Sequence, residues 1–444
     1  SYGDSPYQSF SAYAGNPYFI DFEQLEEQGL LEHTDYADAN WGSPNKVDYE
    51  RLYQMCFPIL KKAFQAFDRT NPDYVAFCEK HRAWLPDYAL FMALKQHFGG
   101  KPWMRWPEDI RLRRREAVER YRKALSEDVA LFTYLQFLFF RQWDALRAYA
   151  AEQGVRIIGD LPIYVAMDSA DVWAEPENFQ LDAQLTPTEV AGVPPDYFAA
   201  DGQLWGNPLY NWDAMKADGF GWWIRRVDGA RRLYDLLRLD HFRGFERYWA
   251  VPYGAATARN GRWVQGPGMD LLRVLTGWFP DLRFIAEDLG QLTPEVHALR
   301  DAAGLPGMKV LEFAFDSRDG GGNAYLPENY PEHCVAYVGT HDNDTALGWM
   351  KTAPAEDVAY AREYLHETED GEAARAMLTA IWKSRAELAI VQAQDILGLG
   401  SEARMNTPST VGENWRWRAK EGSFTPELAA ELREKMEACG RLEK

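Results

Sequence analysis

The feature that most constrains the fold of this chain is a repeated alternation of a short apolar run, a polar tip and a helical segment. Six such runs follow one another: VRIIGD (155–160), LYDLLRLDHFRG (233–244), RFIAEDLG (283–290), GMKVLEFAF (307–315), CVAYVGTHDND (334–344) and LAIVQAQDILG (388–398). Apolar residues recur at helical spacing between several of them, at 268–279, 293–304 and 354–365. This alternation is typical of βα units in a buried parallel sheet. It favours an α/β fold, built as a barrel or as a doubly wound sheet.

The sequence does not carry the glycine-rich motifs of nucleotide-binding sheets. No GxGxxG follows any of the six runs, and no GxxxxGK[ST] occurs. The nucleotide-binding versions of the doubly wound sheet are therefore disfavoured. The chain of 444 residues is longer than one ordinary domain, but a (β/α)8 barrel with insertions reaches this length.

The composition excludes several classes of function. The chain has 48 Lys and Arg against 67 Asp and Glu, a formal net charge of -19. Such a charge repels phosphate, which argues against nucleic acid and anionic membranes as partners. No apolar run reaches the roughly 18 residues that a membrane span needs, and the polar start SYGDSPYQSF does not resemble a secretion signal. We expect a cytoplasmic protein.

The metal-ligating residue types are scattered. The four cysteines form no CxxC pair, and the eight histidines form no HExxH motif. We expect no metal site and no cofactor.

Three segments differ in character. Residues 1–46 are rich in Gly, Pro, Asn, Tyr and Ser and are predicted to be loop. Residues 47–152 carry apolar residues at three-to-four spacing and are predicted to form a helical insertion. Residues 153–444 are predicted to hold the strands of the parallel sheet, inserted loops and a C-terminal helix opened by Thr425 and Pro426.

Three acidic residues stand at three separate strand tips. Asp240 ends LLRLD, Glu287 ends RFIAE, and Asp342 follows VGTH. In a barrel, the tips of parallel strands converge on the face where active sites lie. Retaining glycoside chemistry uses three such acids: a nucleophilic carboxylate, a carboxyl group that acts as acid and base, and a third acid that binds sugar hydroxyls. An acid after a strand is also commonly a helix cap or a loop charge, so position alone does not decide its role.

Neighbouring residues strengthen the interpretation. Arg238 lies two residues before Asp240, hence on the same face of a strand, where it can orient the carboxylate. His341, beside Asp342, can bond a sugar hydroxyl. Asp288 and Asp344 are rival acids, for which turn capping and loop bonding are expected.

These motifs together resemble the α-amylase superfamily and, within it, glycoside hydrolase family 77, the 4-α-glucanotransferases. The resemblance runs from Ser1 to the C-terminus. It is carried by LRLDHFRGFERYW, FIAEDLG and VGTHDND, and further by SYGDSPYQSFSAYAGNPY, IIGDLPIYVAMDSADVWA, VAGVPPDYFAADGQLWGNPLYNW, GRWVQGPG, GLPGMKVLEFAF, SEARMNTPST and NWRWR. It implies a (β/α)8 barrel with helical insertions and transfer of α-1,4-glucan segments through a covalent glycosyl-enzyme.

The resemblance also implies roles for single residues. Asp240 matches the nucleophile, Glu287 the general acid/base, and Asp342 the carboxylate that binds and distorts the donor sugar. The matched substrate contacts are Arg238, His341, Asp160, Ser5, Tyr7, Gln203, Trp205, Asp196 and, at the donor side, Asn406. Trp263 lies in GRWVQGPG, a loop that the family folds over the acceptor channel, and its glycines would act as hinges.

Two of the eight barrel strands have no counterpart among the six runs. The resemblance implies that two strands and roughly fifty residues precede SYGDSPYQ, so we expect an N-terminally incomplete sequence that lacks the first two strands.

Three functions stay open at this point. The implied one is a retaining 4-α-glucanotransferase whose partners are α-1,4-glucans such as maltooligosaccharides, amylose and glycogen. A mainly hydrolytic α-glucanase would use the same three acids. A non-catalytic glucan-binding protein is the third.

Overall fold

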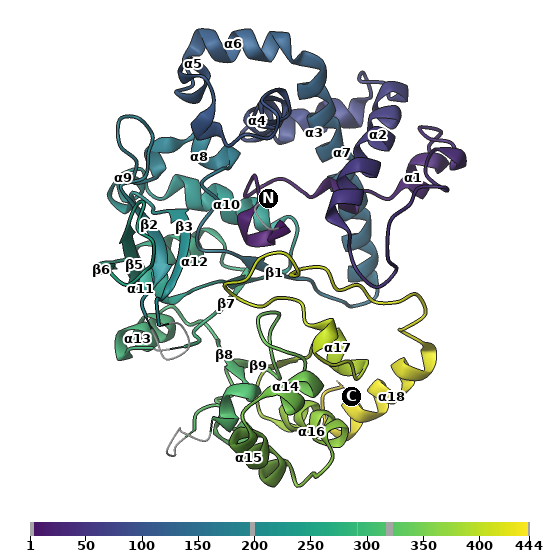
Figure 1. Ribbon diagram of the computed structural model, residues 1–444, viewed down its shortest axis with the longest axis vertical. Coiled ribbons are helices and arrows are strands. Elements are labelled where there is room, and N and C mark those ends of the chain that lie inside the picture. The colour runs from purple at the N-terminus through teal and green to yellow at the C-terminus, as the bar shows by residue number, and fades with distance from the viewer. Residues whose placement is uncertain (1–3, 196–199, 291, 317–322, 443–444) are drawn as a thin grey trace. The chain divides into compact units, whose positions relative to one another are not determined.

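The computed structural model describes residues 4–195, 200–290, 292–316 and 323–442 (Figure 1). It is a mixed α/β structure with two compact units. The first comprises Ser1–Trp41 and Tyr49–Phe284, and the second comprises Gly42–Asp48 and Ile285–Lys444.

All six predicted strands are confirmed. They are β1 (Ile158–Leu161), β4 (Leu236–Leu239), β7 (Arg283–Ala286), β8 (Gly307–Val310), β9 (Cys334–Tyr337) and β10 (Leu388–Ile390). One sheet has the order β1-β4-β7, and another has the order β10-β9-β8. The β1–β4, β8–β9 and β9–β10 pairs are parallel, and every residue of β4 and β9 is buried. Burial on both faces explains why these strands appear in the sequence as continuous apolar runs.

The fourth predicted run is shorter as a strand than expected. β8 ends at Val310, and Leu311–Phe315 form a 3-10 turn. Leu311, Ala314 and Phe315 are fully buried in the core of the second unit. An apolar run of this length does not distinguish strand from buried turn by periodicity, which is why the expectation of a strand over 307–315 was too long.

Helices fill residues 49–152 of the first unit. They are α2 (Tyr49–Ala66), α3 (Pro72–Lys80), α4 (Leu85–His97), α5 (Glu108–Arg111), α6 (Arg115–Ala124) and α7 (Ser126–Glu152). The α4 and α7 helices bury their apolar faces, including Leu94 and Leu135. Gly154 follows α7 at φ 71°, with the N–H of Val155 bonded to Ala150 O at 2.8 Å. This is the glycine-closed helix end that the sequence predicts.

The remaining helices are divided between the two units. In the first unit they are α1 (Phe22–Glu27), α8 (Ala170–Ala174), α9 (Trp212–Ala217), α10 (Gly221–Arg231), α11 (Arg243–Glu246) and α12 (Gly268–Trp278). In the second they are α13 (Pro294–Ala302), α14 (Ala346–Thr352), α15 (Ala355–Leu365), α16 (Asp370–Lys383), α17 (Ala393–Ile396) and α18 (Pro426–Ala438). Thr425 caps α18 by accepting from Leu428 N at 3.2 Å, as predicted. Among the described residues, no helix is both long enough and apolar enough to cross a membrane.

An antiparallel sheet in the first unit was not predicted. Its order is β3-β2-β5-β6, formed by β2 (Glu189–Val193), β3 (Gln203–Pro208), β5 (Arg247–Pro252) and β6 (Arg262–Gln265). Its strands contain Gly, Pro, Asn and Gln, which are depleted in strands, so propensity did not reveal them.

Candidate active site

The sheet register places two of the sequence-predicted site residues side by side. Asp160 on β1 and Arg238 on β4 are partners in the parallel pairing. Arg238 Nη1 donates to Asp160 Oδ1 at 2.6 Å and to Oδ2 at 2.7 Å. Arg238 is only 9% exposed. A buried guanidinium needs such anionic partners, so the pair fixes both side chains.

Asp240, at the end of β4, also bonds the Arg238 guanidinium. Its N–H donates to Leu161 O at 3.0 Å, which continues the β1–β4 ladder. Arg238 Nη1 also donates to Asp240 Oδ1, at 2.8 Å. Two residues of separation put both side chains on one strand face, as the sequence indicated. A cation at this distance stabilises the carboxylate form that a nucleophile needs.

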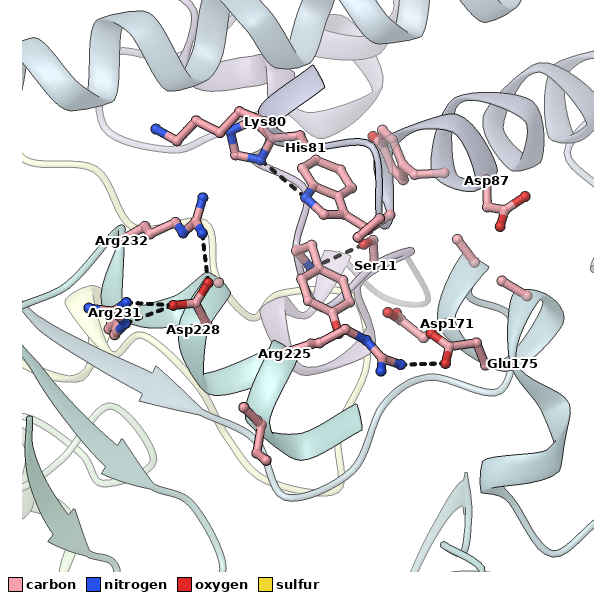
Figure 2. Close-up of a pocket in the computed structure, with 18 of the residues that line it drawn as sticks. Ser11, Lys80, His81, Asp87, Asp171, Glu175, Arg225, Asp228, Arg231 and Arg232 are labelled. Carbon is pink, nitrogen blue, oxygen red and sulfur yellow. Dashed lines mark hydrogen bonds and ion pairs between the residues drawn. The ribbon is translucent and has the colours of Figure 1, made fainter. Parts of the chain in front are cut away.

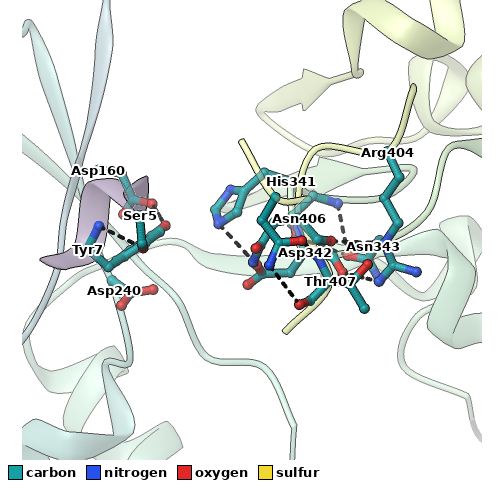
Figure 3. A network of polar contacts seen from close by, with 12 residues as sticks. Ser5, Tyr7, Asp160, Asp240, His341, Asp342, Asn343, Arg404, Asn406 and Thr407 are labelled. Carbon is teal, nitrogen blue, oxygen red and sulfur yellow. Dashed lines mark hydrogen bonds and ion pairs between the residues drawn. The ribbon is translucent and has the colours of Figure 1, made fainter. Parts of the chain in front are cut away.

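The N-terminal segment contributes a phenol to this network (Figure 3). Ser5 Oγ accepts from Tyr7 N at 3.2 Å and caps the short 3-10 turn Pro6–Gln8. Tyr7 OH donates to Asp160 Oδ2 at 2.5 Å. Burial, followed by the negative charge of Asp160, raises the pKa of Tyr7 far above its usual range. Tyr7 is therefore a neutral donor at physiological pH.

Trp205 lies on β3 and packs against the residue that follows Asp240. Its indole is 4.8 Å from the ring of His241, edge to face, and its Nε1 donates to Gln203 Oε1 at 3.1 Å. His241 adopts φ 48°. Burial, and then the charge of Arg243, lower the pKa of His241 to about 4, so the ring is neutral at pH 7. The sequence interpretation did not single out His241.

Trp263 does not lie on a loop, which corrects the prediction. It is on the edge strand β6, opposite Trp249 on β5, with ring centroids 5.1 Å apart. The Arg243 guanidinium lies 4.2 Å from the Trp263 ring centroid. A Cβ at Gly261 would lie 2.3 Å from Trp249 Nε1. The glycine permits close packing against Trp249, and the expected hinge is not what requires it there.

The second unit holds a network around Asp342, on the segment after β9 (Figure 3). Asn406 Nδ2 donates to Asp342 Oδ1 at 2.6 Å, and Arg404 Nη2 donates to the Asp342 carbonyl at 2.7 Å. His341 Nε2 is 3.5 Å from Asp342 Oδ1. His341 O accepts from Asn406 N at 3.1 Å. The segment that carries Asn406 thus holds both predicted sugar-binding groups in place.

Glu287 follows β7 directly, and its Oε1 accepts from Leu289 N at 3.1 Å. The neighbouring Asp288 is 4% exposed and accepts from Met308 N at 2.7 Å and from Arg300 Nη1 at 2.5 Å. These bonds tie the β7 tip to β8 and α13. The expected loop-bonding role of Asp288 is what the structure shows.

Asp344 also has a structural role. Its carboxylate accepts from Ser401 Oγ at 2.6 Å and from its neighbour Thr345 N at 2.8 Å, and it is 8% exposed. Enclosure of this kind leaves Asp342 as the more accessible acid of the VGTHDND segment.

Eight of the predicted site residues thus form two networks, one in each compact unit. Ser5, Tyr7, Asp160, Arg238 and Asp240 form the first, and His341, Asp342 and Asn406 form the second. Asp196 lies outside the described residues. Arg404 is a member of the second network that sequence reasoning missed, although its place in the RMNTP segment could have signalled it.

The first unit also has a cavity of about 400 Å³ between α4, α8 and α10 (Figure 2). The rings of Tyr13 and Trp84 stack beside it at 5.9 Å. Several of its charged side chains pair with one another: Arg225 with Glu175, and Arg231 and Arg232 with Asp228. Within the described part of the chain, no three His, Cys, Asp or Glu side chains are grouped as metal ligands would be.

Comparison with known proteins shows similarity along almost the whole chain. The family model of 4-alpha-glucanotransferases, glycoside hydrolase 77, matches residues 1–424. The chain is 51% identical to the 4-alpha-glucanotransferase of Thermus thermophilus over 99% of this chain and 89% of that protein. It is 46% identical to the enzyme of that name from Clostridium butyricum over 100% and 91% of the two chains.

Solved structures of amylomaltases are also similar to this chain along almost its whole length. The amylomaltase from Streptococcus agalactiae, in complex with acarbose, matches with a TM-score of 0.96 at 40% identity, over 100% of this chain and 90% of that one. The amylomaltase from Corynebacterium glutamicum has the same fold, with a TM-score of 0.78 at 20% identity over 99% and 68% of the chains.

Proposed function

The chain belongs to the 4-alpha-glucanotransferase family, glycoside hydrolase family 77, and we propose that it transfers an α-1,4-glucan segment to the 4-hydroxyl of another glucan or of glucose. Donors would be maltodextrin, starch or glycogen. The observation that carries the proposal is the shared cation: Arg238 Nη1 bonds both Asp240 and Asp160 at the tips of adjacent parallel strands. A carboxylate held in this way is preorganised for attack.

Asp240 acts as the nucleophile. One of its oxygens attacks the anomeric carbon of the donor while the bond to the leaving glycosidic oxygen breaks, and a glycosyl ester forms. Arg238 keeps the carboxylate ionised and oriented before attack. Tyr7 is a neutral phenol that donates to Asp160 Oδ2. It therefore helps to hold the carboxylate that shares the Arg238 cation with Asp240.

Glu287 acts as the acid and then as the base. It gives a proton to the leaving oxygen in the first step and takes one from the acceptor hydroxyl in the second, so the proton count closes over the cycle. Retention requires the two carboxyl groups to lie about 5–5.5 Å apart. This mechanism is typical of the family.

Asp342 and His341 bind hydroxyls of the donor sugar. Asn406 holds the Asp342 carboxylate by its 2.6 Å bond, and this fixes the direction in which the second oxygen points. Contacts that strengthen as the sugar ring flattens contribute to the rate, since they favour the transition state over the bound substrate.

Transfer in place of hydrolysis requires a sugar hydroxyl to reach the glycosyl ester before water does. Exposed aromatic surface near the site would hold the acceptor by stacking. Trp205 and Trp263 are proposed to supply it, and Trp263 is 37% exposed on its edge strand. Gln203, which accepts from the Trp205 indole, and Ser5 are proposed as further glucan contacts.

The six parallel strands are proposed to belong to a (β/α)8 barrel, with 47–152 as a helical insertion and 1–46 as part of the substrate groove. The sequential order of strands in both parallel sheets supports this, as does the bond from Ala286 N, at the end of β7, to Pro306 O, just before β8, at 2.9 Å. The acarbose complex of the Streptococcus agalactiae amylomaltase supports an α-glucan as ligand here.

The test is incubation of the protein with maltotriose, followed by chromatography, with Asp240→Ala as control. Glucose together with a ladder of longer maltodextrins, absent in the control, is the expected result. Glucose and maltose alone would instead identify a hydrolytic α-glucanase. Unchanged maltotriose that still binds the protein would identify a glucan-binding protein.

A further inference from the structure

A buried carboxyl that the proposed reaction does not use lies beneath the tip of β9. Glu312 is the second residue of the 3-10 turn Leu311–Phe315 that follows β8, and its N–H donates to Val338 O at 3.1 Å. The side chain is 5% exposed, and Oε1 has no hydrogen-bond partner among the described residues. A Cβ at Gly339 would lie 2.9 Å from Oε1. The carboxyl therefore touches the backbone that leads into His341 and Asp342.

The turn above Glu312 is closed by side chains. Asn343 Oδ1 accepts from Thr340 N and from Thr340 Oγ1, both at 2.9 Å. Asp342 N donates to Thr340 Oγ1 at 3.3 Å. A Cβ at Gly339 would lie 2.9 Å from Asn343 Cβ as well, so Asn343 and the Glu312 carboxyl both pack against this glycine. Contacts therefore run from the Glu312 carboxyl through Gly339 to Asn343, whose side chain bonds Thr340, and from Thr340 to the backbone of Asp342.

We propose that Glu312 is a positioning residue: its buried side chain supports the Gly339–Asn343 turn and thereby sets the position of Asp342. The inference rests on the role of Asp342 in the proposed function. Glu312 does not itself touch substrate.

The surroundings of Glu312 disfavour a charge on it. Burial raises its pKa well above the usual range, and the neighbouring Asp395 and Asp344 raise it further, while Arg404 and the Asn343 side chain act in the opposite direction. Asp395 is itself enclosed, with its pKa raised to about 6 mainly by burial. A third negative charge in this space would be uncompensated.

Because the pKa of Glu312 differs between the folded and the unfolded chain, the free energy of unfolding depends on pH. The folded pKa of Glu312 is raised, so the folded protein keeps a proton that the unfolded chain releases above about pH 4.5. The contribution of Glu312 to stability is therefore full below that pH and decreases as pH rises towards the folded pKa. A glutamine in its place cannot ionise and has no such dependence.

The experiment compares Glu312→Gln, Glu312→Leu and the wild-type protein. Glu312→Gln should keep the wild-type kcat for maltotriose disproportionation. Its Tm should equal that of the wild type near about pH 4 and exceed it by about 1–3 °C more for each pH unit above that. Glu312→Leu should lower kcat by about 10–100-fold, because its branched side chain replaces the planar carboxyl that packs against Gly339 and therefore displaces the turn.

Glu372→Gln is the matched control. Glu372 is an exposed acid of the same unit, paired with Arg375, and its pKa is lowered. This variant should leave kcat unchanged and should not gain Tm with rising pH.

The proposal is overturned if Glu312→Gln loses as much kcat as Glu312→Leu, or if the Tm difference from wild type does not change with pH. Failure of the wild type to transfer glucan would instead contradict the proposed function. In that case the Tm series would still report whether Glu312 is neutral in the folded protein.

Discussion

One guanidinium nitrogen of Arg238 lies 2.8 Å from Asp240 Oδ1 and also bonds both carboxylate oxygens of Asp160. Removing this cation would leave two carboxylates as uncompensated neighbours at the strand tips. We expect Arg238→Leu to lower kcat/KM for maltotriose by about 100-fold or more. Arg238→Lys should retain more activity, because all three bonds come from a single nitrogen that an ammonium can imitate.

A double variant separates charge from shape at this site. Adding Asp160→Asn to Arg238→Leu removes one of the two carboxylates that the lost cation held. We expect kcat/KM of the double variant to be higher than the value calculated by multiplying the losses of the two single variants. A double-mutant cycle measures this difference. Additive losses would show that Arg238 acts on Asp240 alone.

The Asn406–Asp342 bond makes a second prediction. Asn406→Leu should lower kcat/KM by about 10–100-fold, the value of a hydrogen bond to a charged group. Asn406→Asp should be worse, since it places a second carboxylate against Asp342. Equal losses in the two variants would mean that the charge of Asp342 is not what Asn406 stabilises.

The Gly261 packing predicts an effect on stability. Gly261→Ala should lower Tm, because its Cβ would displace the Trp249 indole, whose Nε1 donates to Ala258 O at 2.8 Å. A Cβ at Gly277 in α12 would have no other group within 4 Å, so Gly277→Ala should keep or raise Tm. If Gly261→Ala lowered activity without changing Tm, a hinge role would be the better account.

Much of the parallel framework was predictable, because fully buried strands leave continuous apolar runs that end in polar tips. The antiparallel strand β6 was not, since two of its four side chains, Arg262 and Gln265, are polar and exposed. Glu312 was also missed, because a carboxyl inside GMKVLEFAF looks in sequence like the polar face of a strand. Its carboxyl packs against Gly339, and its electrostatic surroundings include Asp344 and Asp395, all of which are distant from it in the sequence.

The buried His81 side chain should make the stability of the fold depend on pH in the acidic range. Its ring lies 4.4 Å from Phe77 and 4.9 Å from Phe140, and its Nδ1 accepts from Trp84 Nε1. Burial lowers its pKa to about 4. The folded protein therefore resists protonation that the unfolded chain accepts, so stability is full above about pH 6.5 and is lost as pH falls towards 4.

His81→Gln keeps a hydrogen-bond acceptor for Trp84 and cannot titrate. Its Tm should decrease less than that of the wild type between about pH 6.5 and about pH 4. Parallel decreases in a pH series of thermal denaturation would show that His81 does not carry this sensitivity.

The central claim is that Asp240 forms the covalent bond to the donor sugar, and trapping that bond tests it most directly. A Glu287→Gln variant incubated with α-maltosyl fluoride should accumulate the ester, because fluoride leaves without an acid while the second step lacks its base. Proteolysis and mass spectrometry should then find a maltosyl group on the peptide that contains Asp240. A label on Asp342 or Asp160, or rapid turnover with no labelled peptide, would contradict the account.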